Sequence, residues 1–341
     1  MIPFAVPLAE KALIAEIRGL AKPSSRRGRA GAAVRSTRSA SGVLTGIGDD
    51  CAVLRVGQGR EILVTTDFTL EGVHFRRDCH PAEVVGHRCL ARGLSDVAAM
   101  GGDPLAAFLS LALPRNLSQA WVRRFVRGLT ALGQQFGVTL AGGDTAQSPN
   151  GILADIILVG SVPRGKAVLR SGARAGDLIY VSGELGGSAA AVERMSRDPK
   201  RKLNPREYPQ HFFPQPRIGL GRVLRERNLA SAMIDISDGL STDLAHLCEE
   251  SWVGAEIEAD LIPRATVGKQ AREVDLKLAL HGGEDYELLF TAPRGQRLPP
   301  RVAGISITQI GSIKRTRKIL LINRDGVSRE LQPKGWEHFR K

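Results

Sequence analysis

The spacing of apolar residues in the first half of the chain switches between that of a helix and that of a strand. Apolar residues three or four positions apart predict amphipathic helices over residues 8–20, over residues 82–100 and between Ser118 and Gly137. Ser118 is a favourable N-cap for the last of these helices, and Gly137 is a favourable residue at its end. Short apolar runs typical of strands separate the helices, namely EILVTTDF, LAAFLSLALP, VTLAGGD and ILADIILVGSV.

A second series of elements begins near residue 163. Five runs predict strands, namely LIYVSG, SAMIDIS, YELLFTA, ISITQIGSI and KILLIN. A helix of small residues is expected after GELGG and another from about Ser241, whereas the proline-rich residues 204–217 are expected to form a loop. This irregular alternation predicts an α+β (mixed α/β) fold. With 341 residues, the chain is long enough for two domains, which we place at residues 1–162 and 163–341.

The formal net charge of +13 is unevenly distributed. Residues 22–42 contain six basic residues and no acid, and they are rich in Ser, Gly and Ala without apolar periodicity, which predicts a flexible basic loop. Three interpretations stay open: a solvated segment, a cationic loop close to an anionic ligand, and a nucleic-acid-binding arm. A nucleic-acid-binding protein would explain the charge but not the acidic motifs described below, so we expect no nucleic-acid partner.

Other features of the composition favour a cytoplasmic protein. No apolar run reaches the roughly 18 residues of a transmembrane helix, so no membrane partner is expected. The first residues include Glu10 and Glu16 and lack a basic stretch before their apolar residues, which argues against a secretory signal. The four cysteines show neither a CxxC pair nor a zinc-binding spacing, and they are expected to be reduced thiols.

The acidic residues gather in short motifs that are flanked by glycine or hydroxyl residues. These motifs are GIGDD (46–50), TTD (65–67), SD (95–96), GGDT (142–145), DISDG (235–239) and GGEDYE (282–287). Any one of them could be a turn with an Asx hydrogen bond. Most of them, however, follow a predicted strand or lie at a turn, where a rigid scaffold presents functional groups. Grouped carboxylates beside hydroxyls suit Mg²⁺, which takes oxygen ligands from carboxylates and substrate phosphates. The sequence therefore predicts a magnesium site.

Two glycine-rich segments resemble phosphate-binding loops to different degrees. Residues 160–167 (GSVPRGKA) nearly match the P-loop, but Ala167 replaces the hydroxyl that binds Mg²⁺ and no helical pattern follows, so we reject this segment. The loop GELGG, residues 183–187, precedes a predicted helix and is a weaker candidate. Its alternative is a tight turn into a closely packed helix of small residues.

The ordered motifs of the chain resemble those of thiamine-monophosphate kinase. The matching motifs cover nearly the whole chain from residue 46, and they are GIGDDCAVL, TTDFTLEGVHF, LSDVAAMGGDP, GGDT, LRSGARAGD, IDISDGLSTDL, GGEDYELLFT and GWEHF. The resemblance implies an ATP- and Mg²⁺-dependent enzyme that phosphorylates thiamine monophosphate to thiamine diphosphate, the last step of thiamine diphosphate biosynthesis. It also implies the fold of a wider superfamily, which includes aminoimidazole ribonucleotide synthetase. In that fold an N-terminal domain, which binds metal and ATP, pairs with its copy in a homodimer barrel, and a C-terminal α/β sandwich-like domain completes the site for ATP and substrate.

The resemblance further implies roles for individual residues. The expected ligands of several Mg²⁺ ions are Asp50, Thr65, Thr66, Asp67, Asp96, Asp144, Asp235 and Asp238. The expected ATP contacts are Gly143, Arg170 and Ser237, and the expected contacts to thiamine monophosphate are His74, Glu284 and Trp336. The acceptor phosphate is already ionised near neutral pH, so no residue is assigned as a general base.

Structural alternatives stay open for four of these residues. His74 could be a surface histidine of a turn, and Trp336 could dock the C-terminal tail on the core. Arg170 could be a solvated arginine, and Glu284 could cap a neighbouring turn. The sequence also departs from the family pattern around Arg127, where an aromatic residue is sometimes found, so the residue that stacks on adenine is not identified. Rival enzymes of the superfamily would require a reactive cysteine near the N-terminus or a C-terminal cysteine, and the sequence shows neither.

Overall fold

The described part of the chain forms two compact units. The computed structural model describes residue 19 and residues 43–45, 53–54, 56–198, 202–296 and 298–336. The basic segment 22–42, Asp50 and nearly all of the helix predicted over residues 8–20 lie outside these described residues. Unit 1 comprises Met1–Gly93 and Pro104–Ser161, and unit 2 comprises Leu94–Asp103 and Val162–Lys341. No helix among the described residues is long and apolar enough to cross a membrane.

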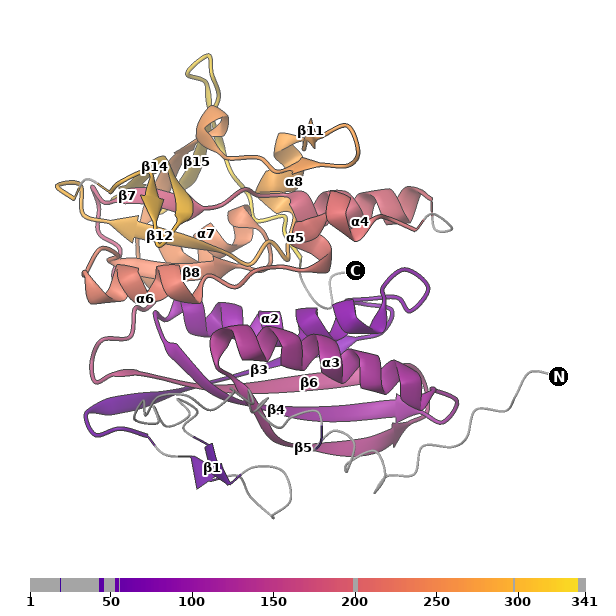
Figure 1. Ribbon diagram of the computed structural model, residues 1–341. Helices are drawn as coiled ribbons and strands as arrows, with labels where there is room; N and C mark the ends of the chain where they lie inside the picture. Colours follow the sequence, from indigo (N-terminus) through magenta and orange to yellow (C-terminus); the bar gives the residue numbers. More distant parts are fainter. Residues whose placement is uncertain are drawn as a thin grey trace, which may run out of the picture. The chain divides into compact units, whose positions relative to one another are not determined.

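Unit 1 contains a four-stranded sheet with the strand order β3-β6-β4-β5. Its strands are β3 (Arg60–Leu70), β6 (Leu153–Pro163), β4 (Asp103–Pro114) and β5 (Thr139–Ser148), and a separate pair is formed by β1 (Val43–Thr45) and β2 (Val53–Leu54). The helices α2 (Ala82–Ala99) and α3 (Gln119–Phe136) cover one face of the sheet (Figure 1). Alternate residues of β4 and β6 are buried, because successive side chains of a strand point to opposite faces.

Helices α2 and α3 lie close together because each has a glycine at their contact. A Cβ atom on Gly86 would lie 1.9 Å from the carbonyl oxygen of Phe125, and a Cβ atom on Gly128 would lie 1.9 Å from the carbonyl oxygen of Glu83. Each distance is far below a van der Waals contact, so any larger residue would force the helices apart. The two glycines therefore set the distance between α2 and α3.

Unit 2 contains a larger sheet in which β16-β15-β9-β14-β7-β12-β8 are neighbours in this order and β13 pairs with β14. The strands are β7 (Leu178–Ser182), β8 (Ala232–Ile236), β9 (Gly254–Glu258), β12 (Glu287–Ala292), β13 (Arg301–Val302), β14 (Ile305–Lys314), β15 (Ile319–Ile322) and β16 (Ser328–Glu330). The pairs from β9 through β14, β7 and β12 to β8 are antiparallel, whereas β15 is parallel to β9. This mixture of directions confirms the predicted α+β class.

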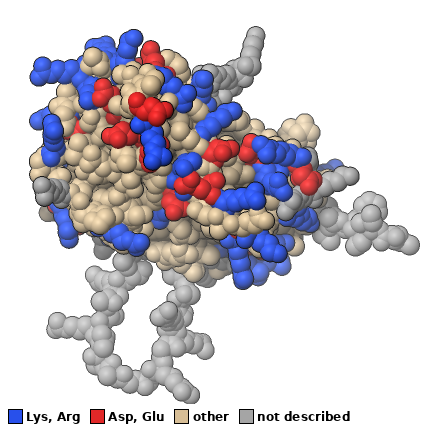
Figure 2. Space-filling view, turned by 90° about the horizontal axis from the view of Figure 1, so that it is seen from above, with Lys and Arg blue, Asp and Glu red and all other residues tan. Residues whose placement is uncertain are grey.

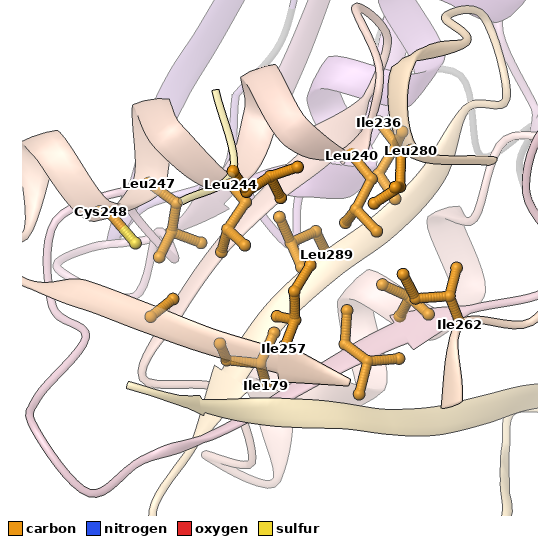
Figure 3. Close-up of a cluster of buried hydrophobic side chains, with 14 of the residues drawn as sticks. Ile179, Ile236, Leu240, Leu244, Leu247, Cys248, Ile257, Ile262, Leu280 and Leu289 are labelled. Atoms are coloured by element: carbon orange, nitrogen blue, oxygen red, sulfur yellow. The ribbon is translucent and has the colours of Figure 1, made fainter. Parts of the chain in front are cut away.

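The helices of unit 2 pack beside this sheet. They are α4 (Gly187–Arg197), α5 (Pro209–Phe212), α6 (Ile218–Glu226), α7 (Leu240–Glu250) and α8 (Leu276–His281), with two 3₁₀ turns, η1 (Pro205–Glu207) and η2 (Ala259–Leu261), and a short hairpin of β10 (Thr266–Val267) and β11 (Arg272–Glu273). In the core, Leu240, Leu244 and Leu247 of α7 lie over Ile257 of β9 and Leu289 of β12 (Figure 3). These leucines are three or four positions apart, so they form one face of α7.

The packing of α7 also fixes the position of its first turn. Only residues 237–239 separate the last residue of β8 from the first residue of α7. The start of α7 therefore lies at the end of β8, where the DISDG motif places its acidic residues.

Candidate active site

One buried carboxylate holds the turn between β8 and α7. Asp243, in the first turn of α7, is 2% exposed. Its Oδ2 atom accepts hydrogen bonds from the backbone N–H groups of Ser237, Asp238 and Gly239, at 3.1, 3.1 and 3.0 Å. These N–H groups precede the helix and have no partner within it, so a side-chain acceptor is needed to satisfy them. The turn that carries an expected metal ligand and an expected ATP contact is thus fixed from one side.

The carbonyl groups of the same turn hold two other segments of unit 2. The Ser237 carbonyl accepts a hydrogen bond from the Glu284 N–H at 2.8 Å, and the Asp238 carbonyl accepts one from the Trp336 N–H at 3.0 Å. Four residues predicted from the sequence are therefore brought together from three distant parts of the chain. The backbone of Trp336 docks the tail, as the structural alternative suggests, but its side chain is 52% exposed and does not fill the core. Glu284 has a left-handed φ of 65°.

Asp235 is connected to the motif that contains Asp96. Asp235 is buried at the end of β8, and its Oδ2 atom accepts a hydrogen bond from the Ser95 hydroxyl at 2.7 Å. Ser95 precedes Asp96 in the LSD motif, and both residues lie in the last part of α2, which belongs to unit 2. The structure therefore links the two expected metal-binding motifs of unit 2 through one side-chain hydrogen bond.

Negative charge is concentrated at this end of β8. Burial, and then the carboxylates of Asp235 and Asp238, raise the pKa of Asp243 well above its ordinary value. A cation beside these carboxylates would relieve their repulsion. No three His, Cys, Asp or Glu side chains among the described residues are arranged to hold a metal ion by themselves. This donor set fits Mg²⁺, which is commonly held by one or two carboxylates together with substrate phosphates, and it does not fit a zinc site closed by protein ligands.

In unit 1, the alternation of side chains along β3 divides the TTD motif. Thr65 and Asp67 point to the face covered by α2, where the Arg92 Nε atom lies 3.7 Å from Asp67 Oδ1. Thr66 points to the opposite face, and its hydroxyl donates to Asp155 Oδ1 at 2.6 Å. The structure thus places the side chains of Thr65 and Asp67 on one face and separates that of Thr66 from them. Strand geometry alone requires this separation.

The GGDT motif lies on β5 beside β4. Gly143 has a φ of 151°, and a Cβ atom on it would lie 1.9 Å from the carbonyl oxygen of Leu109. Only glycine fits this conformation and this contact, so the fold itself requires a glycine at position 143, in addition to the expected contact with ATP. Asp144 is exposed, and its Oδ1 atom accepts the Thr145 N–H at 2.8 Å.

His74 is held in the turn that follows β3. Its Nδ1 atom accepts a hydrogen bond from the Leu70 N–H at 3.0 Å, so a neutral His74 ring carries its proton on Nε2. The side chain is partly buried. A partly exposed histidine that accepts a hydrogen bond from its own turn is compatible with the structural alternative, so the expected contact with substrate stays a prediction.

Arg170 has an exposed side chain on the loop between β6 and β7. Its carbonyl oxygen accepts a hydrogen bond from the Ser251 hydroxyl at 2.8 Å, and the neighbouring Leu169 carbonyl accepts the Met233 N–H at 3.0 Å. Met233 lies near the start of β8, whereas the turn at residues 237–239 follows its end. The structure therefore does not place the backbone of Arg170 beside that turn.

The two glycine-rich segments are not open phosphate loops. No helix lies between β6, which ends at Pro163, and β7, which confirms the rejection of residues 160–167. In residues 183–187, the Gly186 N–H at the start of α4 already donates to Asp285 Oδ2 at 2.7 Å. A Cβ atom on Gly186 would lie 2.8 Å from the backbone nitrogen of Ala279. The alternative of a tight, closely packed turn therefore describes this segment.

The sequence interpretation did not single out Asp155, Asp243 and Asp285. Asp243 and Asp285 lie within the quoted motifs IDISDGLSTDL and GGEDYELLFT, so an acidic residue at these positions was visible. The hydrogen bond of Asp285 to the Gly186 N–H is a tertiary contact that no local pattern shows, whereas the bonds of Asp243 reach only four to six residues back along the chain. Asp155 lies on β6, and only the pairing of strands brings it to Thr66.

The chain matches family models over most of its length. Residues 48–162 match the N-terminal domain of AIR synthase related proteins, and residues 174–298 match their C-terminal domain. A crystal structure of the hydrogenase maturation protein HypE shares the fold, with a TM-score of 0.68 at 18% identity, over 86% of this chain and 94% of that chain. The two matches, which together cover more than half of the chain, show that it belongs to the AIR synthase related proteins.

Higher identities are found with thiamine-monophosphate kinases. That of Salmonella typhimurium is 39% identical over 317 residues, which are 90% of this chain and 94% of that protein. That of Bacillus subtilis is 31% identical over 309 residues, 88% of this chain and 95% of that protein. The crystal structure of the kinase from Stenotrophomonas maltophilia has a TM-score of 0.76 at 34% identity, over 94% of this chain and 98% of that chain. A structure of AaThiL complexed with AMPPCP and TMP has a TM-score of 0.73 at 34% identity, over 84% of this chain and 89% of that chain. The chain therefore belongs to the thiamine-monophosphate kinase family.

Proposed function

We propose that this chain transfers the γ-phosphoryl group of ATP to the phosphate of thiamine monophosphate and forms thiamine diphosphate, the last step of thiamine diphosphate biosynthesis. Its family membership supports this activity, and the similar structure solved with AMPPCP and TMP supports both substrates. The observation that carries the proposal is the turn at residues 237–239. In this turn the carbonyls of Ser237 and Asp238 accept the N–H groups of Glu284 and Trp336, which supports a site where the residues expected to contact nucleotide, metal and substrate lie together.

The reaction brings two anions together, so positioning and charge neutralisation are the main requirements. Asp235 and Asp238 would hold Mg²⁺, which when bound neutralises phosphate charge. The planar guanidinium of Arg170 suits bidentate contact with a phosphate. The exposed indole of Trp336 suits stacking on the heteroaromatic rings of thiamine. The acceptor phosphate is its own nucleophile near neutral pH, so no general base is required.

The metal ligands of both units and the roles of the two domains belong to the same proposal. In unit 1 we assign Thr65, Asp67 and Asp144 to metal binding, and in unit 2 we assign Asp96 in addition to the two acids of the DISD motif. Carboxylates beside hydroxyls support the choice of Mg²⁺, which prefers oxygen ligands. A cytoplasmic location is also proposed, on the basis of the sequence alone.

We further propose a homodimer in which the sheet of unit 1 takes part. On the face of β3 away from α2, the side chains of Ile62, Val64 and Phe68 are 45%, 66% and 54% exposed. Apolar side chains exposed in a row on one strand favour a protein interface. Analytical ultracentrifugation should find a dimer, and Val64→Glu should shift it toward monomer. A wild-type monomer at micromolar concentration would contradict this part of the proposal.

The activity is tested by incubating purified protein with ATP, Mg²⁺ and either thiamine monophosphate or free thiamine. Thiamine diphosphate should form from the monophosphate, and free thiamine should hardly react, because the acceptor in this reaction is a phosphate. A protein that prefers thiamine, or that phosphorylates neither acceptor, would refute the proposed function.

A further inference from the structure

The first turn of α7 holds the tail of the chain as well as the turn at residues 237–239. The Thr242 hydroxyl oxygen accepts the Gly335 N–H at 3.0 Å, and the Ser241 hydroxyl oxygen accepts the Lys334 N–H at 3.4 Å. The tail also lies directly against the turn, since a Cβ atom on Gly335 would be 2.0 Å from the Asp238 carbonyl oxygen. The residue that follows these contacts is Trp336.

Two neighbouring side chains of this helical turn therefore hold two different segments. Consecutive residues of an α-helix point about 100° apart, and here the side chain of Thr242 is directed to the tail and that of Asp243 to the turn. Side chains at a helix start also lean toward its N-terminus, where the turn and the tail lie. Thr242 reaches the tail, and Asp243 reaches the three N–H groups of the turn.

The contacts form a hierarchy. Asp243 fixes the turn. The turn then holds Glu284 through the Ser237 carbonyl and Trp336 through the Asp238 carbonyl. Thr242 fixes only the tail. Loss of the Asp243 contacts should therefore disturb everything that the turn carries, whereas loss of the Thr242 contact should disturb the tail alone.

We propose that Thr242 and Asp243 are positioning residues of the kinase site, an inference that rests on the proposed function. Asp243 orients the turn that presents the metal and nucleotide ligands, and Thr242 orients the tail that presents Trp336 to thiamine monophosphate. The rival interpretation is that both residues only cap α7. A lost cap lowers stability and does not discriminate between substrates. The two interpretations therefore differ in how the Michaelis constants change.

Thr242→Val tests the substrate side, because valine keeps the shape of threonine and removes the acceptor. The KM for thiamine monophosphate should rise about tenfold, which corresponds to about 1.4 kcal/mol, and the KM for ATP should stay within about twofold. Thr242→Ser keeps a hydroxyl and should restore the wild-type KM. Thr266→Val, at an exposed position of β10, is the matched control. Equal changes for both substrates, or no change for thiamine monophosphate, would overturn the role of Thr242.

Asp243→Ala tests the turn. The KM for ATP, the KM for thiamine monophosphate and the Mg²⁺ concentration for half-maximal rate should each rise about tenfold or more. Asp243→Asn keeps one acceptor oxygen and should produce smaller changes in the same direction, and it replaces the alanine variant if that variant does not fold. Wild-type constants in a folded Asp243→Ala variant, or in a folded Asp243→Asn variant where the alanine variant does not fold, would overturn the role of Asp243.

A measurement that does not depend on turnover separates this inference from the proposed function. Amide hydrogen exchange followed by mass spectrometry should show faster exchange over residues 237–239 in Asp243→Asn and at Gly335 in Thr242→Val, with other helices unchanged. Unchanged exchange at these sites refutes the positioning contacts even if the wild type is active. If the wild type does not phosphorylate thiamine monophosphate, the proposed function fails, and positioning within a kinase site fails with it.

Discussion

The buried carboxyl group of Asp285 should make the stability of the protein depend on pH in an unusual direction. Asp285 is 4% exposed, and its Oδ2 atom accepts the Gly186 N–H at 2.7 Å. Its Oδ1 atom has no hydrogen-bond partner among the described residues. Burial raises its pKa from 3.8 to about 8; hydrogen bonds from the Gly186 and Ser188 backbones oppose the rise, and the charge of Glu287 adds to it.

The direction of the pH effect follows from the number of bound protons. Between pH 4 and pH 8 the folded protein keeps the proton of Asp285, whereas the unfolded chain has released it. The folded state therefore binds more protons, and the free energy of unfolding falls as pH rises through this window. From pH 5 to pH 8 the linkage amounts to about 4 kcal/mol, since each pH unit corresponds to about 1.4 kcal/mol. Relaxation around the buried carboxylate reduces this figure, so we expect about 2–4 kcal/mol.

Asp285→Asn isolates this contribution, because asparagine has a similar shape and does not titrate. Urea denaturation followed by circular dichroism should be measured for both proteins at pH 5 and pH 8. The free energy of unfolding of the variant, relative to wild type, should increase by about 2–4 kcal/mol over this interval. All other titrating groups are common to both proteins and cancel in the difference.

Two results would refute the reasoning. A difference that does not change with pH would mean that Asp285 has no raised pKa. A wild-type protein that gains stability relative to the variant between about pH 3 and pH 5 would mean that folding lowers the pKa of Asp285. In that case the N-terminus of α4 would stabilise its charge more than burial destabilises it.

Four further substitutions test other parts of the structure. Asp67→Asn and Asp96→Asn should each leave the fold intact and lower turnover by about 10² or more at saturating Mg²⁺, because metal charge stabilisation contributes several kcal/mol; near-normal rates would contradict the metal assignment. Gly86→Ala should lower the free energy of unfolding by about 3 kcal/mol, since the new Cβ atom would lie 1.9 Å from a backbone oxygen of α3, and an unchanged denaturation midpoint would show that the helices can separate freely. Arg217→Met should lower the free energy of unfolding by about 3–5 kcal/mol, because Arg217 donates to the buried Glu287 from both Nε and Nη2. A loss below about 1 kcal/mol would show that water reaches Glu287.

The sequence predicted the long elements well because their apolar periodicity is regular. The predicted limits of α3 are confirmed: Ser118 accepts the Trp121 N–H, and Gly137 has a left-handed φ of 69°. Shorter elements were missed. The proline-rich residues 204–217 contain η1 and α5, each of which begins at a proline. Proline is common at the first position of a helix, so the sequence did carry this signal.

The candidate site was predicted as a set of motifs but not as a geometry. Alternation along β3 could have shown that Thr66 faces away from Thr65 and Asp67, because strand periodicity is local. No local pattern could have shown that the N–H groups of Glu284 and Trp336 meet consecutive carbonyls of one turn. That contact depends on the pairing of β12 with β8 and on the path of the tail after β16.

The turn at residues 237–239 explains why these distant segments meet at one place. Each peptide group of the turn has an N–H group and a carbonyl group, and a buried polar group needs a partner. Asp243 satisfies three N–H groups with one oxygen atom, and the carbonyls of Ser237 and Asp238 accept hydrogen bonds from outside the turn. Glu284 and Trp336 provide these donors through their backbone N–H groups. The sequence IDISDGLSTDL therefore encodes both the turn and the side chain that orients it, and the carbonyls of this turn determine where the segments of Glu284 and Trp336 attach.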